Sequence, residues 1–193
     1  PFQRHTRPSG KLKGWGKLLE ICADHDSNLG LIAQREFSNV EVTRITQSED
    51  WSHPATVKWA NDLACEFPGM SIHGSLPCTP WTSWQAMNVF KKGLGYWQEL
   101  KKRRSASRRM LKSFIELASV VLDNGGEVSF EWPNNCSGWL LPDLLNFIDK
   151  HGLYSVVVDG CSLGMTDGHG VPILKRWRFI TSNRRMYDAL SAL

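Results

Sequence analysis

Apolar and polar positions alternate along the chain in blocks that predict strands separated by helices. Short, almost continuous apolar runs favour strands that are covered on both faces. Longer segments with apolar residues at three- and four-residue steps favour helices, and the clearest of these ends at Gly125 and Gly126. The predicted strands are Lys17–Ala23, Asn39–Thr46, Met70–Gly74, Glu127–Trp132, Tyr154–Cys161 and Pro172–Ile180. The predicted helices are Leu29–Phe37, Ala55–Glu66, Trp84–Leu100 with a break near Gly93 and Gly95, Ser107–Asp123, Pro142–His151 and Asn183–Leu193.

This alternation predicts an α/β fold of βαβ units around a mostly parallel sheet. Only a Gly-rich connection, 164–170, separates the last two strands, so we expect an antiparallel hairpin at one edge of the sheet. Residues 17–193 are predicted to form a single domain, because their number suits one hydrophobic core. Residues 1–16 look like an irregular basic lead-in.

Composition narrows the class of protein. The chain of 193 residues is 41% hydrophobic and 22% charged, which is typical of a globular protein rather than a disordered one. The five cysteines are odd in number and form no Cys-x-x-Cys pair, which argues against a disulfide scaffold and against a local zinc site. We therefore predict an intracellular protein without a metal centre. No apolar run approaches 18 residues, so no membrane span is expected.

Positive charge is concentrated in one stretch. Of 23 basic residues, nine lie between Lys91 and Lys112, where Glu99 is the one acidic residue. Cations at the start of a helix oppose its macrodipole, so their accumulation favours a polyanionic partner, although a solvated helix face is the ordinary explanation. The predicted nucleic-acid contacts are Lys101, Lys102, Arg103, Arg104, Arg108 and Arg109, with Trp81 and Trp84 as surfaces on which bases could stack.

The segment Met70–Gln85 carries the most distinctive chemistry. Its apolar start breaks at Leu76-Pro77, because proline donates no ladder hydrogen bond, and Cys78 follows between two prolines. Cys78 is thus expected at the carboxyl end of a strand, where open α/β sheets bind ligands. A buried structural cysteine in a loop is the alternative.

Three motifs resemble the C5-cytosine methyltransferases, in that family's order. They are Gly74-Ser-Leu-Pro-Cys78, then Phe130-Glu-Trp-Pro133, where the family usually has Glu-Asn-Val, and then Gly170-Val-Pro leading into a strand with Arg176 and Arg178. The likeness extends loosely over residues 17–182, and similar strings occur in methyltransferase-like modules of retroelement or viral-type polyproteins. It implies a Rossmann-like methyltransferase fold. The segment before Cys78 is short, so one strand–helix unit of the standard sheet is expected to be absent.

The resemblance implies an S-adenosylmethionine-dependent methyltransferase acting on nucleic acid. Cys78 would be the nucleophile that adds to cytosine C6, Glu131 would hold the base's Watson–Crick edge, and Arg176 and Arg178 would hold phosphate and order the loop. This chemistry needs a thiolate and a flipped or single-stranded base. The residues implied in cofactor binding are Glu20, Asp24, Asp26, Gly30, Asp50 and Pro77.

Departures from the pattern of the C5-cytosine methyltransferases leave a second interpretation open. The loop after the first strand has one glycine, Gly30, where the family has two or three, and no target-recognition segment follows the third motif. Cys136 and Cys161 are also expected near strand ends, and a family of RNA cytosine methyltransferases uses a cysteine on the neighbouring strand. The alternative is a catalytically inactive methyltransferase-fold module that binds RNA or DNA through its basic helix within a larger polyprotein.

Overall fold

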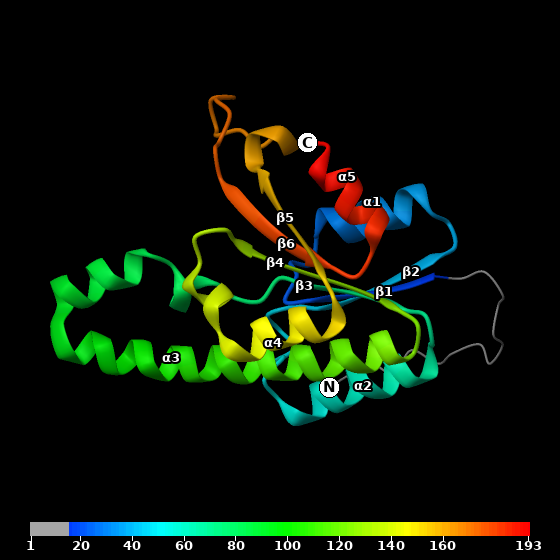
Figure 1. Cartoon of the computed structure of the whole chain (residues 1–193), viewed down its shortest axis with the longest axis horizontal. Coiled ribbons are helices and arrows are strands. Elements are labelled where there is room, and N and C mark those ends of the chain that lie inside the picture. Colours follow the sequence, from blue (N-terminus) through cyan, green and yellow to red (C-terminus); the bar gives the residue numbers. More distant parts are fainter. Residues whose placement is uncertain (1–15) are drawn as a thin grey trace.

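The computed structural model describes residues 16–193, and the predicted basic lead-in lies outside this part except for Gly16, which opens the first strand. The strands are β1 (Gly16–Ile21), β2 (Val40–Ile45), β3 (Ser71–Gly74), β4 (Glu127–Pro133), β5 (Tyr154–Asp159) and β6 (Arg176–Thr181). The α-helices are α1 (Asn28–Glu36), α2 (Pro54–Glu66), α3 (Trp84–Asp123), α4 (Pro142–His151) and α5 (Arg184–Ser191). Figure 1 shows them arranged around one sheet.

The sheet is mixed, in the order β2-β1-β3-β4-β6-β5. The ladders from β2 to β4 are parallel, and β6 is antiparallel to both β4 and β5. The predicted α/β class and the antiparallel pair at one edge are therefore confirmed. The placement of β6 between β4 and β5 was not predicted. The last strand is also shorter than expected, because the chain from Pro172 to Lys175 forms an irregular connection before β6 begins at Arg176.

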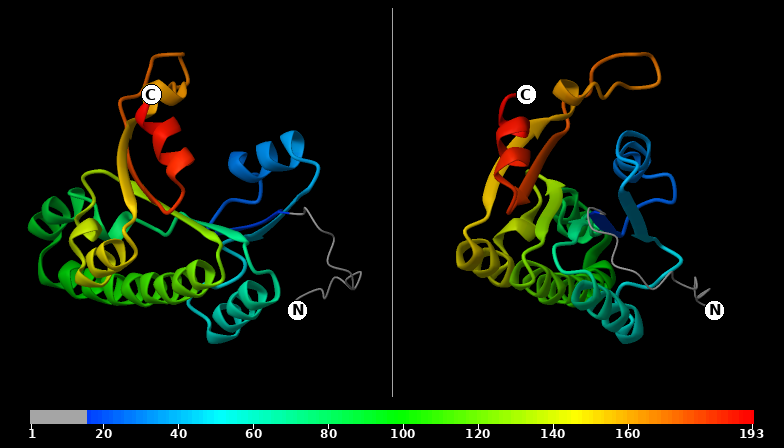
Figure 2. Two further views of the ribbon diagram at one scale, coloured as in Figure 1. Left: turned by 45° about the vertical axis from the view of Figure 1, so that its right-hand side comes forward. Right: turned by 90° about the vertical axis from the view of Figure 1, so that its right-hand side faces the viewer.

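One face of the sheet carries α2, α3 and α4 and holds the hydrophobic core (Figures 1 and 2). Successive side chains of a strand point to opposite faces of the sheet, so Val128, Phe130 and Trp132 of β4 share one face, and all three are buried there. The ring centroids of Phe130 and Trp132 lie 4.8 Å apart in an edge-to-face arrangement, and Trp139 packs edge-on against both.

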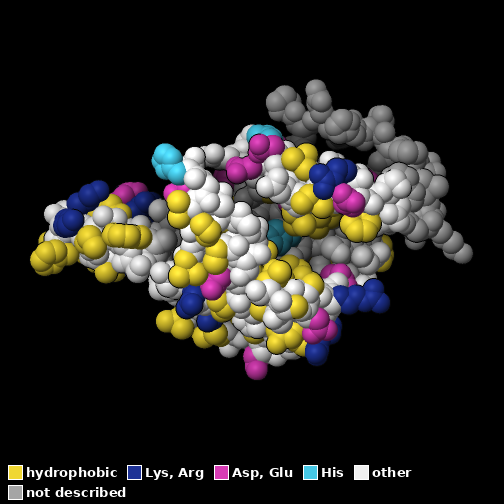
Figure 3. All heavy atoms as spheres, turned by 90° about the horizontal axis from the view of Figure 1, so that it is seen from above, with side chains coloured by type: hydrophobic (Ala, Val, Ile, Leu, Met, Phe, Trp, Pro, Cys, Tyr) yellow, Lys and Arg dark blue, Asp and Glu magenta, His cyan; other side chains and the backbone are white. Residues whose placement is uncertain are grey.

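The opposite face is only partly covered. It carries α1 above β1 and β2 and α5 above β5 and β6 (Figure 2). Helix α1 has one buried residue, Gly30, and α5 has none. A groove of about 330 Å³ remains between the two helices, with β3 and β4 as its floor. Seen as spheres, this face is hollowed between apolar walls, with a histidine side chain within the hollow (Figure 3).

Helix α3 is a helical hairpin rather than a straight rod. At Gly93 the backbone takes φ 72° and ψ −160°, which breaks the helix and turns the chain back toward the sheet. The break predicted near Gly93 and Gly95 is confirmed at Gly93. In contrast, the gap predicted between Leu100 and Ser107 is absent, because the second arm is helical from the turn through Lys101 and Lys112 up to Asp123.

Candidate functional site at the ends of strands β3 and β4

Strands β3 and β4 bring the Pro-Cys segment beside Glu131. The two strands are parallel neighbours, with Gly74 opposite Phe130, so the residues that follow them meet at one edge of the sheet. Ser75 lies three residues before Cys78, and its Oγ is 3.2 Å from Glu131 Oε1. Cys78 follows the end of β3, as predicted, and Glu131 lies near the end of the neighbouring strand β4.

Glu131 faces the groove rather than the hydrophobic core. Its side chain is 22% exposed, and burial raises the pKa of its carboxyl, while the Ser75 hydrogen bond and the charge of Lys175 act in the opposite direction. Burial disfavours the charged carboxylate, so this group holds its proton to a higher pH than an exposed glutamate. Such a carboxyl is able to donate a hydrogen bond.

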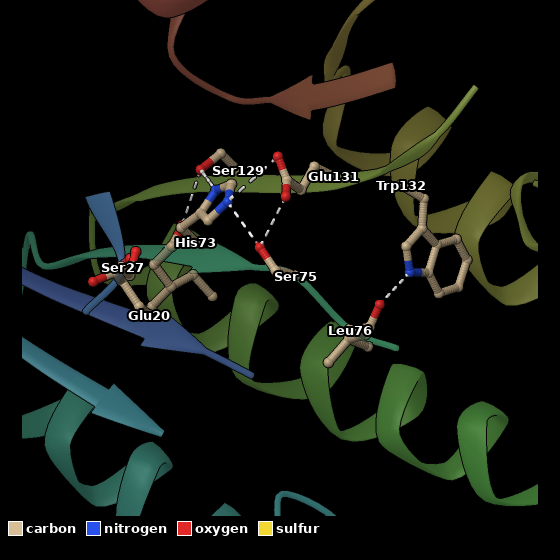
Figure 4. A network of polar contacts seen from close by, with 9 residues as sticks. Glu20, Ser27, His73, Ser75, Leu76, Ser129, Glu131 and Trp132 are labelled. Atoms are coloured by element: carbon tan, nitrogen blue, oxygen red, sulfur yellow. Dashed lines mark hydrogen bonds and ion pairs between the residues drawn. The ribbon is translucent and has the colours of Figure 1, made fainter. Parts of the chain in front are cut away.

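A histidine that the sequence analysis did not select lies next to Glu131. His73 Nε2 is 4.0 Å from Glu131 Oε2 and 3.2 Å from Ser75 Oγ, and His73 Nδ1 is 2.8 Å from Ser129 Oγ (Figure 4). Burial lowers the pKa of His73 to about 4, so its ring is neutral at pH 7. The available signal was the alternation of Ser71 and His73 of β3, and of Ser75 just after it, with the buried Ile72 and Gly74.

The lowered pKa of His73 predicts acid sensitivity. An unfolded histidine has a pKa of about 6.5, so the unfolded state binds the extra proton as the pH falls through that value toward 4. We expect the free energy of unfolding to fall by about 3 kcal/mol over this window relative to a His73→Gln variant, and the difference to be constant below it. Urea denaturation from pH 8 to pH 3.5 measures it.

The comparison between variants removes the contribution of Glu131, whose raised pKa has the opposite sign and favours the folded state as the pH falls. His169→Gln, at an exposed loop position, is the matched control and is expected to keep the wild-type pH profile. Parallel profiles for wild type and His73→Gln would contradict a neutral, buried His73.

Cys78 precedes a short 3₁₀ helix, Thr79–Trp81, at this same edge. It is half-buried and packs against the hydrophobic core. Cys136, which follows β4, is buried and lies close enough for the two thiols to interact electrostatically. Burial, and then the neighbouring Cys78, raise the pKa of Cys136 to about 11, so Cys136 is a thiol at neutral pH.

Trp81 was predicted as a stacking surface for bases, and that prediction is wrong for this structure. The ring is only 4% exposed, and its Nε1 donates to Ser107 Oγ at 2.8 Å. Arg104, predicted to contact nucleic acid, lies over the Trp81 ring at 5.2 Å and donates to the Pro80 carbonyl at 3.0 Å. Both side chains therefore fix the loop after Cys78 to helix α3.

Arg176 and Arg178 do not lie beside Glu131, and their contact with phosphate stays a prediction. Residues opposite one another in an antiparallel ladder share a face, and Arg178 pairs with Trp132 while Glu131 pairs with Phe179. Arg178 donates to Asn134 Oδ1 and lies over the Trp139 ring, whereas Arg176 forms an exposed ion pair with Asp159 of β5. Neither arginine reaches Glu131. Arg178 does order the loop after β4.

Two predicted cofactor residues, Glu20 and Gly30, are part of a buried ion pair or pack against it. Glu20, 1% exposed, accepts a hydrogen bond from Ser27 Oγ and pairs with Arg44 Nε at 3.0 Å. A Cβ at Gly30 would lie 2.1 Å from Arg44 Nη2 and 2.3 Å from Glu20 Oε2. Glycine is thus required at position 30 to make room for this pair. Glu20 and Gly30 are accounted for without a cofactor.

The remaining predicted cofactor residues lie at the carboxyl ends of β1 to β3. Asp24, Asp26, Asp50 and Pro77 are all exposed. Asp50 accepts from Ser52. Burial, and then the charge of Asp50, raise the pKa of the thiol of Cys22, the residue after β1, to about 12. Carboxylates can accept hydrogen bonds from hydroxyl and ammonium groups, so the contact of these residues with S-adenosylmethionine stays a prediction. Gly30 makes room for the ion pair rather than for a cofactor.

The predicted basic residues divide into two groups. Lys101, Lys102, Arg108 and Arg109 are exposed, whereas Arg103 and Arg104 are half-buried. Arg103 donates to Tyr96 Oη at 2.9 Å, so its position is explained within the hairpin.

The hairpin also exposes apolar side chains that the sequence analysis did not include, apart from Trp84. They lie on its first arm and at its turn and are Trp84 (66% exposed), Met87 (44%), Phe90 (89%) and Leu94 (77%). Apolar and basic side chains gather on the projecting lobe at the left of Figure 3.

No protein-family model matches the chain, and no curated protein matches it. Within residues 16–193, no group of three or more His, Cys, Asp or Glu side chains is arranged to hold a metal ion. The same part of the chain contains no helix with both the length and the apolarity needed to cross a membrane.

Proposed function

We propose that this chain is an S-adenosylmethionine-dependent, C5-cytosine methyltransferase-like domain that acts on nucleic acid. Cys78 is the nucleophile, and Glu131 binds the Watson–Crick edge of the target base. The observation that carries the proposal is the hydrogen bond between Ser75 and Glu131, since it holds the Pro-Cys segment and the glutamate together at the ends of adjacent strands.

The chemistry gives each residue a task. C5 of cytosine is too weak a nucleophile to accept a methyl group, and addition of the Cys78 thiolate at C6 makes it enamine-like. A carboxyl that keeps its proton stabilises the addition by donating a hydrogen bond to N3, and burial raises the pKa of Glu131 in the direction this requires. The base must be flipped out of a duplex or already single-stranded.

The topology supports the proposal. A mostly parallel sheet that ends in an antiparallel pair is typical of the methyltransferase variant of the doubly wound fold. Helix α2 runs directly from the edge strand β2 to β3 on the far side of β1, which suits a sheet with one strand–helix unit fewer.

S-adenosylmethionine supplies the methyl group when bound. Asp24, Asp26 and Asp50 are the residues of this chain that would accept hydrogen bonds from it. The test of the proposed function is transfer of a labelled methyl group to cytosine C5 in DNA and RNA oligonucleotides, both single- and double-stranded, read by mass spectrometry of the nucleosides. If calorimetry detects no binding of S-adenosylmethionine to the folded protein, the chain is not an S-adenosylmethionine-dependent enzyme.

The second candidate is an inactive module that binds nucleic acid through the hairpin of α3. It is favoured by the exposure of Lys101, Lys102, Arg108 and Arg109 on the same hairpin as the exposed rings of Trp84 and Phe90, since basic and aromatic side chains together bind single strands. The two candidates are separated by Cys78, which the module does not need.

Both candidates predict binding that depends on salt. Each phosphate contact with a single strand contributes about −0.7 to the slope of log K against log salt. Changing Lys101, Lys102, Arg108 and Arg109 to glutamine is therefore expected to reduce the magnitude of the slope by roughly 3 for an oligonucleotide that contacts all four. Fluorescence anisotropy at salt concentrations from about 50 to about 300 mM, a range that includes physiological ionic strength, measures the slope of log K against log salt.

The matched control removes four cations from other elements, namely Arg35, Lys58, Lys150 and Arg185. It lowers the net charge equally, so a purely global electrostatic effect would reduce both slopes alike. Equal slopes for the two quadruple variants would show that the hairpin is not the surface that binds nucleic acid.

A further inference from the structure

Four polar side chains on the groove side of β3 and β4 form one connected chain. Ser129 Oγ is 3.4 Å from the Ile72 carbonyl oxygen and 2.8 Å from His73 Nδ1. His73 Nε2 is 3.2 Å from Ser75 Oγ, which is 3.2 Å from Glu131 Oε1. Figure 4 shows His73 and Ser75 facing Ser129 and Glu131 of β4.

Each serine hydroxyl has one hydrogen to donate, and a neutral imidazole carries hydrogen on one nitrogen. When Glu131 carries a proton on Oε1, it donates to Ser75, Ser75 donates to His73 Nε2, and His73 Nδ1–H donates to Ser129. Ser129 then donates to the Ile72 carbonyl, so every contact is satisfied with His73 as the Nδ1–H tautomer.

When Glu131 is charged, this direction fails, because the carboxylate has no hydrogen to give. The reverse direction links the same four side chains: Ser129 donates to His73 Nδ1, His73 Nε2–H donates to Ser75, and Ser75 donates to Glu131 Oε1. Ser129 then no longer donates to the Ile72 carbonyl. The bond to a carboxylate is charge-assisted and therefore stronger than a neutral one. The hydrogen bonds thus link the tautomer of His73 to the state of Glu131.

We infer that His73 is a positioning residue whose tautomer is coupled, through Ser75, to the protonation of Glu131. This inference rests on the proposed function for its biological use. When the carboxyl proton lies on Oε1, it is donated to Ser75 and His73 is the Nδ1–H tautomer. When Glu131 has given up that proton, as it would to the ring nitrogen of a bound base, Ser75 donates to Oε1 and His73 is the Nε2–H tautomer.

The surroundings of His73 contain few other charges. Glu20 is opposite His73 in the β1–β3 ladder and is paired with Arg44. Glu127 lies farther along β4 and accepts from Asn183 Nδ2 at 2.6 Å. Lys175 acts on Glu131 from the connection before β6. The residues that α1 and α5 contribute to the groove, Leu29 and Met186, carry no charge.

The experiment is NMR of the whole chain with ¹⁵N-labelled histidine, in which long-range proton correlations distinguish the Nδ1–H and Nε2–H tautomers. His73 is assigned by the signal lost in His73→Gln. In wild type, we expect the two ring nitrogens to exchange their chemical shifts between pH 5 and pH 9, from Nδ1–H at the acid end to Nε2–H at the alkaline end. In Ser75→Ala and in Glu131→Gln, the tautomer is expected to be independent of pH.

Glu127→Gln is the matched control, since it removes a carboxylate from the same strand and the same groove but outside the chain of contacts, and it is expected to keep the exchange. A single His73 tautomer at all pH values in wild type, or exchange that persists in Ser75→Ala, would overturn the inference. The measurement needs no substrate or cofactor. If the tautomer of His73 changes with pH but the protein transfers no methyl group, the inference about His73 stands and the proposed function is rejected.

Discussion

Replacing Cys78 by alanine is expected to abolish the covalent complex between this chain and a 5-fluorocytosine oligonucleotide in the presence of S-adenosylmethionine. After thiolate addition at C6 and methylation of C5, fluorine cannot leave as the C5 proton does, so the wild-type adduct persists. Without the Cys78 sulfur, the bond to C6 is not formed. Methyl transfer should fall by on the order of 10³-fold or more, because loss of a nucleophile removes the covalent pathway. Denaturing gels and intact-mass spectrometry detect the adduct.

Two other cysteines serve as controls in the same assay. Cys161→Ala, at an exposed position beyond β5, is expected to trap as wild type does. Cys136→Ala tests the neighbouring strand, because Cys136 lies close to Cys78. Trapping that persists in Cys78→Ala and disappears in Cys136→Ala would move the nucleophile to β4. Absence of trapping in wild type, together with nucleic-acid binding that Cys78→Ala leaves unchanged, would favour the inactive module.

Replacing Arg44 by methionine is expected to destabilise the fold by about 3 kcal/mol, because it leaves the Glu20 carboxylate buried without its partner. Glu20 is 1% exposed and Arg44 17% exposed, so solvent cannot compensate for the lost charge. The free energy of unfolding from urea denaturation at pH 7 measures the effect. Gly30→Ala is expected to act in the same direction, because its methyl group would occupy the space of the ion pair.

A double variant, Glu20→Gln with Arg44→Met, removes both charges and is expected to recover most of the stability that Arg44→Met loses. Arg35→Met is the control for an exposed pair: Arg35 and Glu36 lie 2.8 Å apart, but both are largely in water, so a change within about 0.5 kcal/mol is expected. A similarly small change in Arg44→Met would show that the Glu20–Arg44 pair does not stabilise the fold. Glu20 would then again be open to a role with the cofactor.

The sequence was sufficient for features that depend on local pattern. The run at β1 and the alternation of β4, with Val128, Phe130 and Trp132 toward the core, gave the strands and the α/β class. Proline after Leu76 ended β3 early enough to place Cys78 at the sheet edge. The short Gly-rich connection before β6 indicated its antiparallel pairing with β5. Each of these signals lies within a few residues of the feature it predicts.

Features that depend on distant partners were not accessible in this way. Arg104 was predicted to contact phosphate because its neighbours in the sequence are basic. In the structure, it donates a hydrogen bond to the Pro80 carbonyl and lies over the Trp81 ring. Likewise, the pairing of Glu20 with Arg44 requires the register of β1 against β2, which no local pattern specifies. His73 was overlooked because a single histidine in a strand has no meaning until Ser129 and Glu131 are placed beside it.

The insertion of β6 between β4 and β5 has a consequence for synthesis on the ribosome. Strand β5 leaves the ribosome about twenty residues before β6, yet β6 is its partner in the sheet, so β5 has no ladder to join during that interval. Strands β1 to β4, in contrast, can pair as soon as Pro133 has emerged. A nascent chain stalled when Asp159 has left the ribosome but Arg176 has not is therefore expected to bury its first four strands while β5 stays accessible to protease, and release of β6 should protect both strands in one step.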